Sequence, residues 1–146
     1  MKILYTANYL DKYAQQMAML HPQEADKIIS FLYRSNESNV DAVIQSYKII
    51  SRAVFSHNKE KAREGLKHLS ITFQKLQDSL HKLAKILQQY NRGSLPDGLL
   101  PLEAPPVTKI DAFLQADNLS NVGLIIERAF QSFQLKAQKI RNKLKI

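Results

Sequence analysis

The chain has 146 residues, of which 45% are apolar and 23% charged, and it contains no cysteine. These values exclude a disulfide framework and a thiolate metal site, and they argue against a disordered chain. No apolar run approaches the ~20 residues of a membrane-spanning helix, and the N-terminus does not match a signal peptide. The sequence therefore predicts one cytoplasmic domain over residues 1–146. Its formal net charge of +8 favours acidic or polyanionic partners.

The start of the chain predicts a helix over residues 6–20. Tyr5, Tyr9 and Tyr13 recur every four residues and so share one helical face. Such a stripe of aromatic side chains is typical of a core or a protein interface. Pro22 ends this helix, because proline disfavours the helical conformation in the residue before it.

The next part of the chain predicts two amphipathic helices, over residues 22–34 and 38–56. Polar residues 35–38 separate them and predict a break. A tight turn follows at His57 and Asn58, in which Asn58 caps the next helix.

Residues 59–90 carry the most regular pattern in the chain and predict one long helix. Apolar residues recur there at alternating spacings of four and three, namely Ala62, Leu66, Leu69, Phe73, Leu76, Leu80, Leu83, Leu87 and Tyr90. Such a heptad repeat is typical of a coiled-coil seam. Gly65, Thr72 and Ser79 repeat every seven residues beside the seam, and such small residues allow a neighbouring helix to approach closely.

Residues 91–107 are rich in proline and leucine and predict an irregular connection between the first four helices and the C-terminal ones. Its apolar residues, which include Leu99 and Leu100, suit packing against the core or docking into a partner. A short helix with a Thr108–Asp111 capping box is expected next, and a last helix from about Ser120 to the C-terminus.

No motif in the sequence favours catalysis. Asp78 with His81 and Glu64 with His68 approach the spacing of metal ligands, but the heptad places both pairs on outward faces. No glycine-framed serine indicates a nucleophile elbow. We therefore expect no enzymatic activity, and the sequence indicates no metal, cofactor, membrane contact or small-molecule substrate.

Basic residues gather on residues 59–90 and near the C-terminus. They are Lys61, Lys67, Lys75, Lys82, Lys85, Lys136, Lys139, Arg141, Lys143 and Lys145. Lysines at helical spacing suit contact with nucleic-acid phosphates, with an affinity that falls steeply as salt rises. A solvated surface is the alternative, and arginine is the better bidentate ligand for phosphate.

Together these patterns predict an all-α fold, an elongated antiparallel bundle of five to six helices built around residues 59–90. Its apolar helix surface exceeds what a compact monomer needs. We therefore predict a non-enzymatic interaction protein, such as an adaptor, assembly factor or chaperone-like module, that captures a protein partner or self-associates. Partner contacts are expected at Tyr5, Tyr9, Tyr13, Gly65, Thr72, Ser79, Leu99 and Leu100. The alternative is a nucleic-acid-binding subunit of a nucleoprotein complex that uses the basic residues above.

Overall fold

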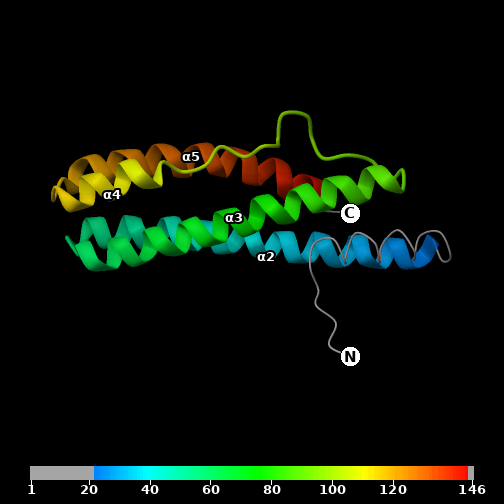
Figure 1. Ribbon diagram of the computed structural model, residues 1–146, viewed down its shortest axis with the longest axis horizontal. Coiled ribbons are helices and arrows are strands. Elements are labelled where there is room, and N and C mark those ends of the chain that lie inside the picture. Colours follow the sequence, from blue (N-terminus) through cyan, green and yellow to red (C-terminus); the bar gives the residue numbers. More distant parts are fainter. Residues whose placement is uncertain (1–21, 145–146) are drawn as a thin grey trace, which may run out of the picture.

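The computed structural model describes residues 22–144, which form four helices (Figure 1). These are α2 (Pro22–Phe55), α3 (Lys59–Gln89), α4 (Val107–Gln115) and α5 (Leu119–Leu144). No strand occurs within residues 22–144, so the predicted all-α class is confirmed. The predicted helix over residues 6–20, with Tyr5, Tyr9 and Tyr13, lies outside the described residues, as does Lys145.

The predicted break at residues 35–38 is wrong, because α2 runs through it as one helix of 34 residues. Leu32, Asn36 and Val40 follow one another at four-residue spacing and are all buried, so the core face continues across the polar segment. The Asn36 side-chain amide donates a 2.9 Å hydrogen bond to the carbonyl of Leu32, one turn earlier. Packing on both sides thus overrides local propensity. The predicted five to six helices become four within the described residues.

Helices α2 and α3 form an antiparallel hairpin joined by a three-residue turn. His57 has a positive φ of 56°, and the N–H of Asn58 donates to the carbonyl of Ala53 at 2.8 Å. The Asn58 side chain accepts a 3.1 Å hydrogen bond from the N–H of Lys61. The predicted tight turn with an Asn58 cap is therefore confirmed. Whether α3 supercoils as a strict heptad repeat implies stays a prediction.

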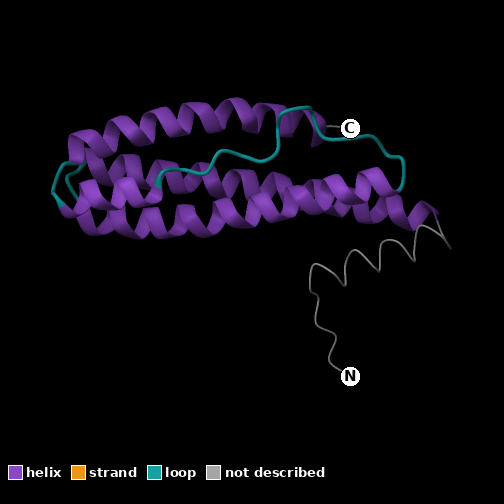
Figure 2. Ribbon diagram, turned by 45° about the horizontal axis from the view of Figure 1, so that its top comes forward, coloured by secondary structure: helices purple, strands orange, loops and turns teal. Residues whose placement is uncertain are grey.

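Residues 91–106 run back along the bundle in irregular form before α4 begins (Figure 2). Leu95, Leu99 and Leu102 are buried, Leu99 completely. The N–H of Leu102 donates to Oε1 of Gln77 on α3 at 2.8 Å. The segment is therefore packed against the core, where together with α4 it closes the side of the bundle beside α3. Because Leu99 is buried within its own chain, the expectation that it contacts a partner is not supported.

Helix α4 begins at Val107 without the predicted capping box. Pro106 occupies the N-cap position, and no side chain caps the first turn. Proline fixes a backbone angle close to the helical one, and the N-terminal turn of a helix tolerates its missing N–H. The structure therefore starts this helix earlier than the predicted cap at Thr108.

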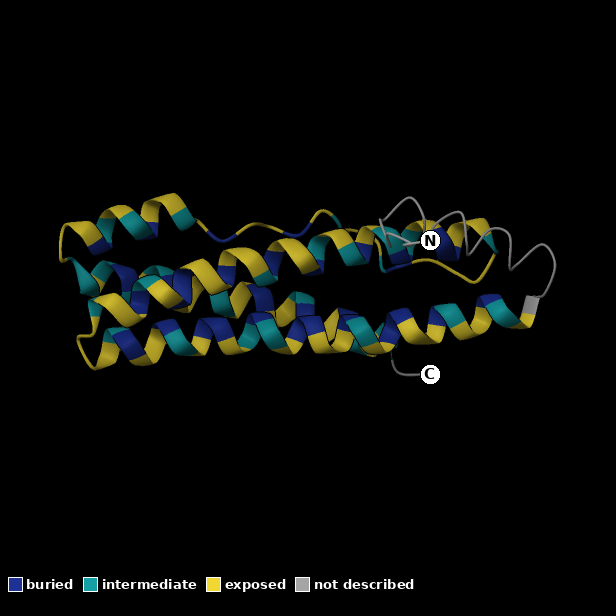
Figure 3. Cartoon of the chain, turned by 60° about the horizontal axis from the view of Figure 1, so that its bottom comes forward, coloured by how far each residue is buried: buried dark blue, intermediate teal, exposed yellow. Residues whose placement is uncertain are grey.

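Helix α5 runs in the same direction as α3 and opposite to α2 (Figure 1). At one end, Lys59 Nζ lies 3.0 Å from Asp117 Oδ1, and toward the other end Arg141 Nη2 lies 2.6 Å from Asp41 Oδ1 on α2. Between these ion pairs the ring of Tyr47 stacks on Phe130, with centroids 5.3 Å apart. Buried residues lie where the helices face one another (Figure 3). One hydrophobic core thus joins all four helices and the 91–106 segment.

Two helical glycines give matched predictions for stability. A Cβ at Gly65 meets Ile50 Cγ1 at 2.8 Å and the Ile50 backbone nitrogen at 3.3 Å, whereas a Cβ at Gly123 meets only Val54 Cγ1, at 3.5 Å. We expect Gly65→Ala to lower the free energy of unfolding by about 1–2 kcal/mol through overpacking. Gly123→Ala should raise it by about 0.5–1 kcal/mol, the usual gain of alanine over glycine in a helix. Urea unfolding measures both, and a stabilised Gly65→Ala variant would contradict the close approach of α2 and α3.

A second stability prediction concerns Asn36, which is fully buried and whose Oδ1 has no hydrogen-bond partner. Leucine branches at the same carbon but is larger, and replacing Asn36 by it removes the desolvation cost of that oxygen. We expect Asn36→Leu to raise the free energy of unfolding by about 1 kcal/mol in the same urea assay. Asn142→Leu, on the exposed face of α5, should change it by less than about 0.5 kcal/mol. A destabilised Asn36→Leu variant would show that the bond to the Leu32 carbonyl outweighs the unpaired oxygen.

Candidate functional site

The seam between α2 and α3 carries two hollows on its solvent side. One, of about 580 Å³, is lined by residues that include Phe31, Asn39, Lys75 and Ser79. The other, of about 670 Å³, lies beside Gly65 near the turn between the helices. Every residue that lines either hollow belongs to α2, α3 or that turn. We call the two hollows and the seam between them the α2–α3 groove.

Small side chains from both helices meet along this groove. Helix α3 contributes the predicted repeat Gly65, Thr72 and Ser79, and α2 contributes Ser35, Asn39, Ala42 and Ser46 at spacings of four, three and four. The helix that approaches Gly65 is α2 of the same chain, so Gly65 is buried there, and its contact with a partner stays a prediction. Thr72 and Ser79 remain half-exposed. The repeat on α2 is a sequence signal that the initial prediction missed.

A hydrogen-bonded cluster of three polar side chains joins the helices between the two hollows. Ser46 Oγ lies 2.7 Å from His68 Nδ1 and 3.2 Å from Thr72 Oγ1. The distance to His68 matches that of a nucleophile and its base, but the Ser46 hydroxyl donates to the carbonyl of Ala42 at 2.9 Å. The single Ser46 hydroxyl proton therefore has two acceptors within reach, and the donor in the Ser46–His68 bond depends on the tautomer of His68. Since Ser46 is also fully buried, the cluster fixes the packing of the helices and presents no nucleophile.

The structure separates the predicted basic residues of α3 from those of α5. Lys75, Lys82 and Lys85 line the hollow beside Phe31, and Lys61 lines the one beside Gly65. Lys67 is exposed on α3 but lines neither hollow.

Three of the four predicted basic residues of α5 that the structure describes instead make contacts within the fold. Lys136 donates to the carbonyl of Gly98 at 2.8 Å, and Arg141 pairs with Asp41. Lys143 Nζ lies close to Gly93 in the 91–106 segment, and Lys139 is exposed. The α5 cations therefore do not extend the basic surface of α3.

The groove also contains residues that the sequence prediction did not select. Phe31 is 63% exposed on its rim, and Ile49 and Arg52 line the hollow beside Gly65. Phe31 and Ile49 lie on the same side of α2 as its small-residue repeat, so the missed repeat could have located them.

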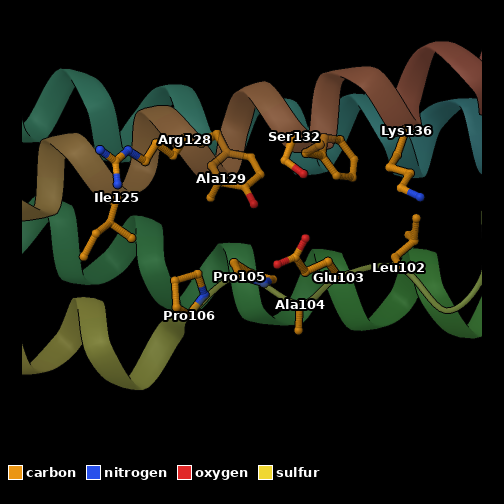
Figure 4. Close-up of a pocket in the computed structure, with 12 residues that line it drawn as sticks. Leu102, Glu103, Ala104, Pro105, Pro106, Ile125, Arg128, Ala129, Ser132 and Lys136 are labelled. Atoms are coloured by element: carbon orange, nitrogen blue, oxygen red, sulfur yellow. The ribbon is translucent and has the colours of Figure 1, made fainter.

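A second cleft, of about 230 Å³, lies between α5 and residues 102–106, with Tyr47 of α2 at its wall (Figure 4). Glu103 and Ser132 point toward one another across it, and Arg128 and Lys136 lie toward its two ends (Figure 4). Tyr47 is only 2% exposed. Burial, and to a smaller extent the nearby Glu103 carboxylate, raise the pKa of its phenol to about 12, because both disfavour the phenolate.

Comparison with protein families, curated proteins and solved structures finds no match to this chain. Among the described residues, no three histidine, aspartate or glutamate side chains gather in a way that could hold a metal ion. None of α2 to α5 is long and apolar enough to cross a membrane. The α2–α3 groove and the cleft beside Tyr47 are therefore the two candidate sites of the described residues.

The raised pKa of Tyr47 predicts a specific loss of stability at high pH. Above the ordinary phenol pKa of 10.0 the unfolded chain ionises Tyr47 while the folded chain keeps it neutral, up to about pH 12. The stability that this tyrosine contributes is thus full below pH 10 and is lost as the pH rises toward 12. We expect urea unfolding of Tyr47→Phe to depend less on pH across this range than that of the parent chain. Equal slopes would contradict a buried phenol.

Proposed function

We propose that this protein is a non-enzymatic interaction module whose α2–α3 groove holds an acidic amphipathic helix of a partner protein. The observation that carries the proposal is the hollow beside Phe31. There an exposed aromatic ring and small side chains lie among three lysines and a single aspartate, Asp78. An amphipathic helix places apolar side chains in such a groove, while its flanking charges meet the rim.

The size of the groove supports a helix as occupant. From Phe31 to Ser56, which line its two hollows, α2 advances about 37 Å at ~1.5 Å per residue. A partner helix of about 25 residues matches this length. The small side chains along the seam would let its backbone approach α2 and α3 closely.

Charge decides which kind of helix fits. The hollow beside Phe31 has three lysines against Asp78, and the hollow beside Gly65 has Arg52 and Lys61 against Glu64. Both are net positive, and such fields attract acidic segments and increase the rate of encounter.

The same residues favour a protein partner over nucleic acid. A nucleic-acid strand carries a phosphate at every nucleotide and so brings negative charge close to Glu64 and Asp78 as well as to the lysines. An amphipathic helix, by contrast, can carry acidic residues at the positions that face cations and neutral residues at the positions that face Glu64 and Asp78. The exposed ring of Phe31 also suits contact with an apolar side chain of such a helix.

The test is a fluorescence-anisotropy titration of the full chain with designed helical peptides. The probe is a helical peptide of about 25 residues, with leucine along one face and glutamate beside it. Its matched control has lysine in place of glutamate. We expect the acidic peptide to bind at micromolar concentration, more weakly at about 200 mM than at about 50 mM salt. The basic peptide should bind at least tenfold more weakly. Equal binding of the two peptides would overturn the charge argument.

Charge reversal locates the site on the protein. We expect Lys75→Glu/Lys82→Glu to weaken binding of the acidic peptide at least about tenfold, since both lysines line the groove. The control Lys67→Glu/Lys139→Glu changes the same total charge at exposed positions outside both hollows and should change affinity less than about threefold. Equal losses in both variants, or tighter binding of single-stranded RNA than of the acidic peptide, would overturn the proposal.

A further inference from the structure

The cleft beside Tyr47 is lined by several polar groups that form no hydrogen bond or ion pair among residues 22–144. The side chain of Tyr47 lines it and presents its hydroxyl to the cleft. Glu103 and Ser132 line it as well, and within residues 22–144 the Glu103 carboxylate forms no ion pair. Hydroxyl and carboxylate oxygens at the wall of a cleft are free to accept hydrogen bonds from a ligand.

These three groups suit a primary ammonium. An ammonium has three N–H donors and no acceptor. Glu103, Tyr47 and Ser132 supply three oxygen acceptors, one of them charged, and Glu103 and Ser132 point toward one another (Figure 4). A cation there also meets the aromatic rings of Tyr47 and Phe133, which attract positive charge.

The remainder of the cleft suits an anion and an apolar chain. Arg128 lines the cleft and forms no ion pair within the described residues, whereas Lys136 is already bonded to the carbonyl of Gly98. Leu102, Pro105 and Ile125 provide apolar walls. The volume of about 230 Å³ lies below the roughly 300–1,000 Å³ of pockets for drug-sized ligands, so the occupant is small.

We propose that this cleft binds a free aliphatic α-amino acid. Its ammonium is held by Glu103, Tyr47 and Ser132, its carboxylate faces Arg128, and its side chain lies against Pro105 and Ile125. The site lies between α5 and the 102–106 segment and shares no residue with the α2–α3 groove. The amino-acid site can therefore be tested independently of the function proposed above.

Isothermal titration calorimetry of the full chain at neutral pH tests the site. The probes are L-leucine, L-isoleucine, L-valine and L-methionine, each titrated up to about 10 mM. We expect saturable binding of at least one of them, with a dissociation constant of about 1 mM or less. When leucine binds, leucine methyl ester lacks the carboxylate and 4-methylpentanoic acid lacks the amine, and each should bind at least tenfold more weakly. No saturable binding of any of the four, or binding of the ester equal to that of leucine, overturns the proposal.

Variants assign the binding to this cleft. Glu103→Gln removes the negative charge that faces the ammonium, and Tyr47→Phe removes an acceptor oxygen, so each should weaken binding of the amino acid at least about tenfold. Glu127→Gln, which removes an exposed carboxylate of α5 that does not line the cleft, should leave binding unchanged. Urea unfolding of Tyr47→Phe confirms that this variant is folded before it is titrated. Unchanged binding in Glu103→Gln would place the ligand elsewhere and contradict the inference.

Discussion

The close approach of α2 and α3 at Gly65 is the constraint on which the rest of the structure depends. Ile50 lies so near Gly65 that even one added carbon has no room, and the Ser46–His68–Thr72 cluster holds the same seam further along. Small side chains at this contact bring two long helices together without large residues to fill the solvent side. The hairpin therefore buries apolar side chains on its inner face and leaves the shallow α2–α3 groove on its outer face. The candidate binding surface is a direct consequence of the packing that stabilises the hairpin.

The side of the bundle beside α3 is built differently. A long helix could have covered it, but residues 91–106 lie there in irregular form and α4 completes it. Leu95, Leu99 and Leu102 provide the buried contacts that a helix face would have supplied. An irregular segment packs less uniformly against a helix than another helix does, and the cleft beside Tyr47 lies between this segment and α5. The two candidate sites thus arise from two different ways of packing against the same core.

The sequence predicted the elements that depend on local chemistry, and it failed where tertiary packing decides. The α2–α3 turn followed from His57 and Asn58, whose backbone and side-chain bonds are local. The uninterrupted α2 did not, because residues 35–38 are polar and only the buried environment of Asn36 shows that the helix continues. The α3 lysines of the groove were selected from their spacing, but the α2 side was missed. Tyr47 and Glu103 lie far apart in sequence, so no pattern in the chain indicates that they share a cleft.

The most direct test of the central claim is to map the contact surface of the acidic helical peptide by amide chemical-shift changes in NMR spectra of the labelled full chain. The account predicts the largest changes along the α2–α3 groove, at Ser35, Ile49 and Ser79. Little change is expected at Ser132 in the separate cleft. Changes confined to α5 and residues 102–106, with none along the seam, would contradict the assignment of the groove as the binding surface.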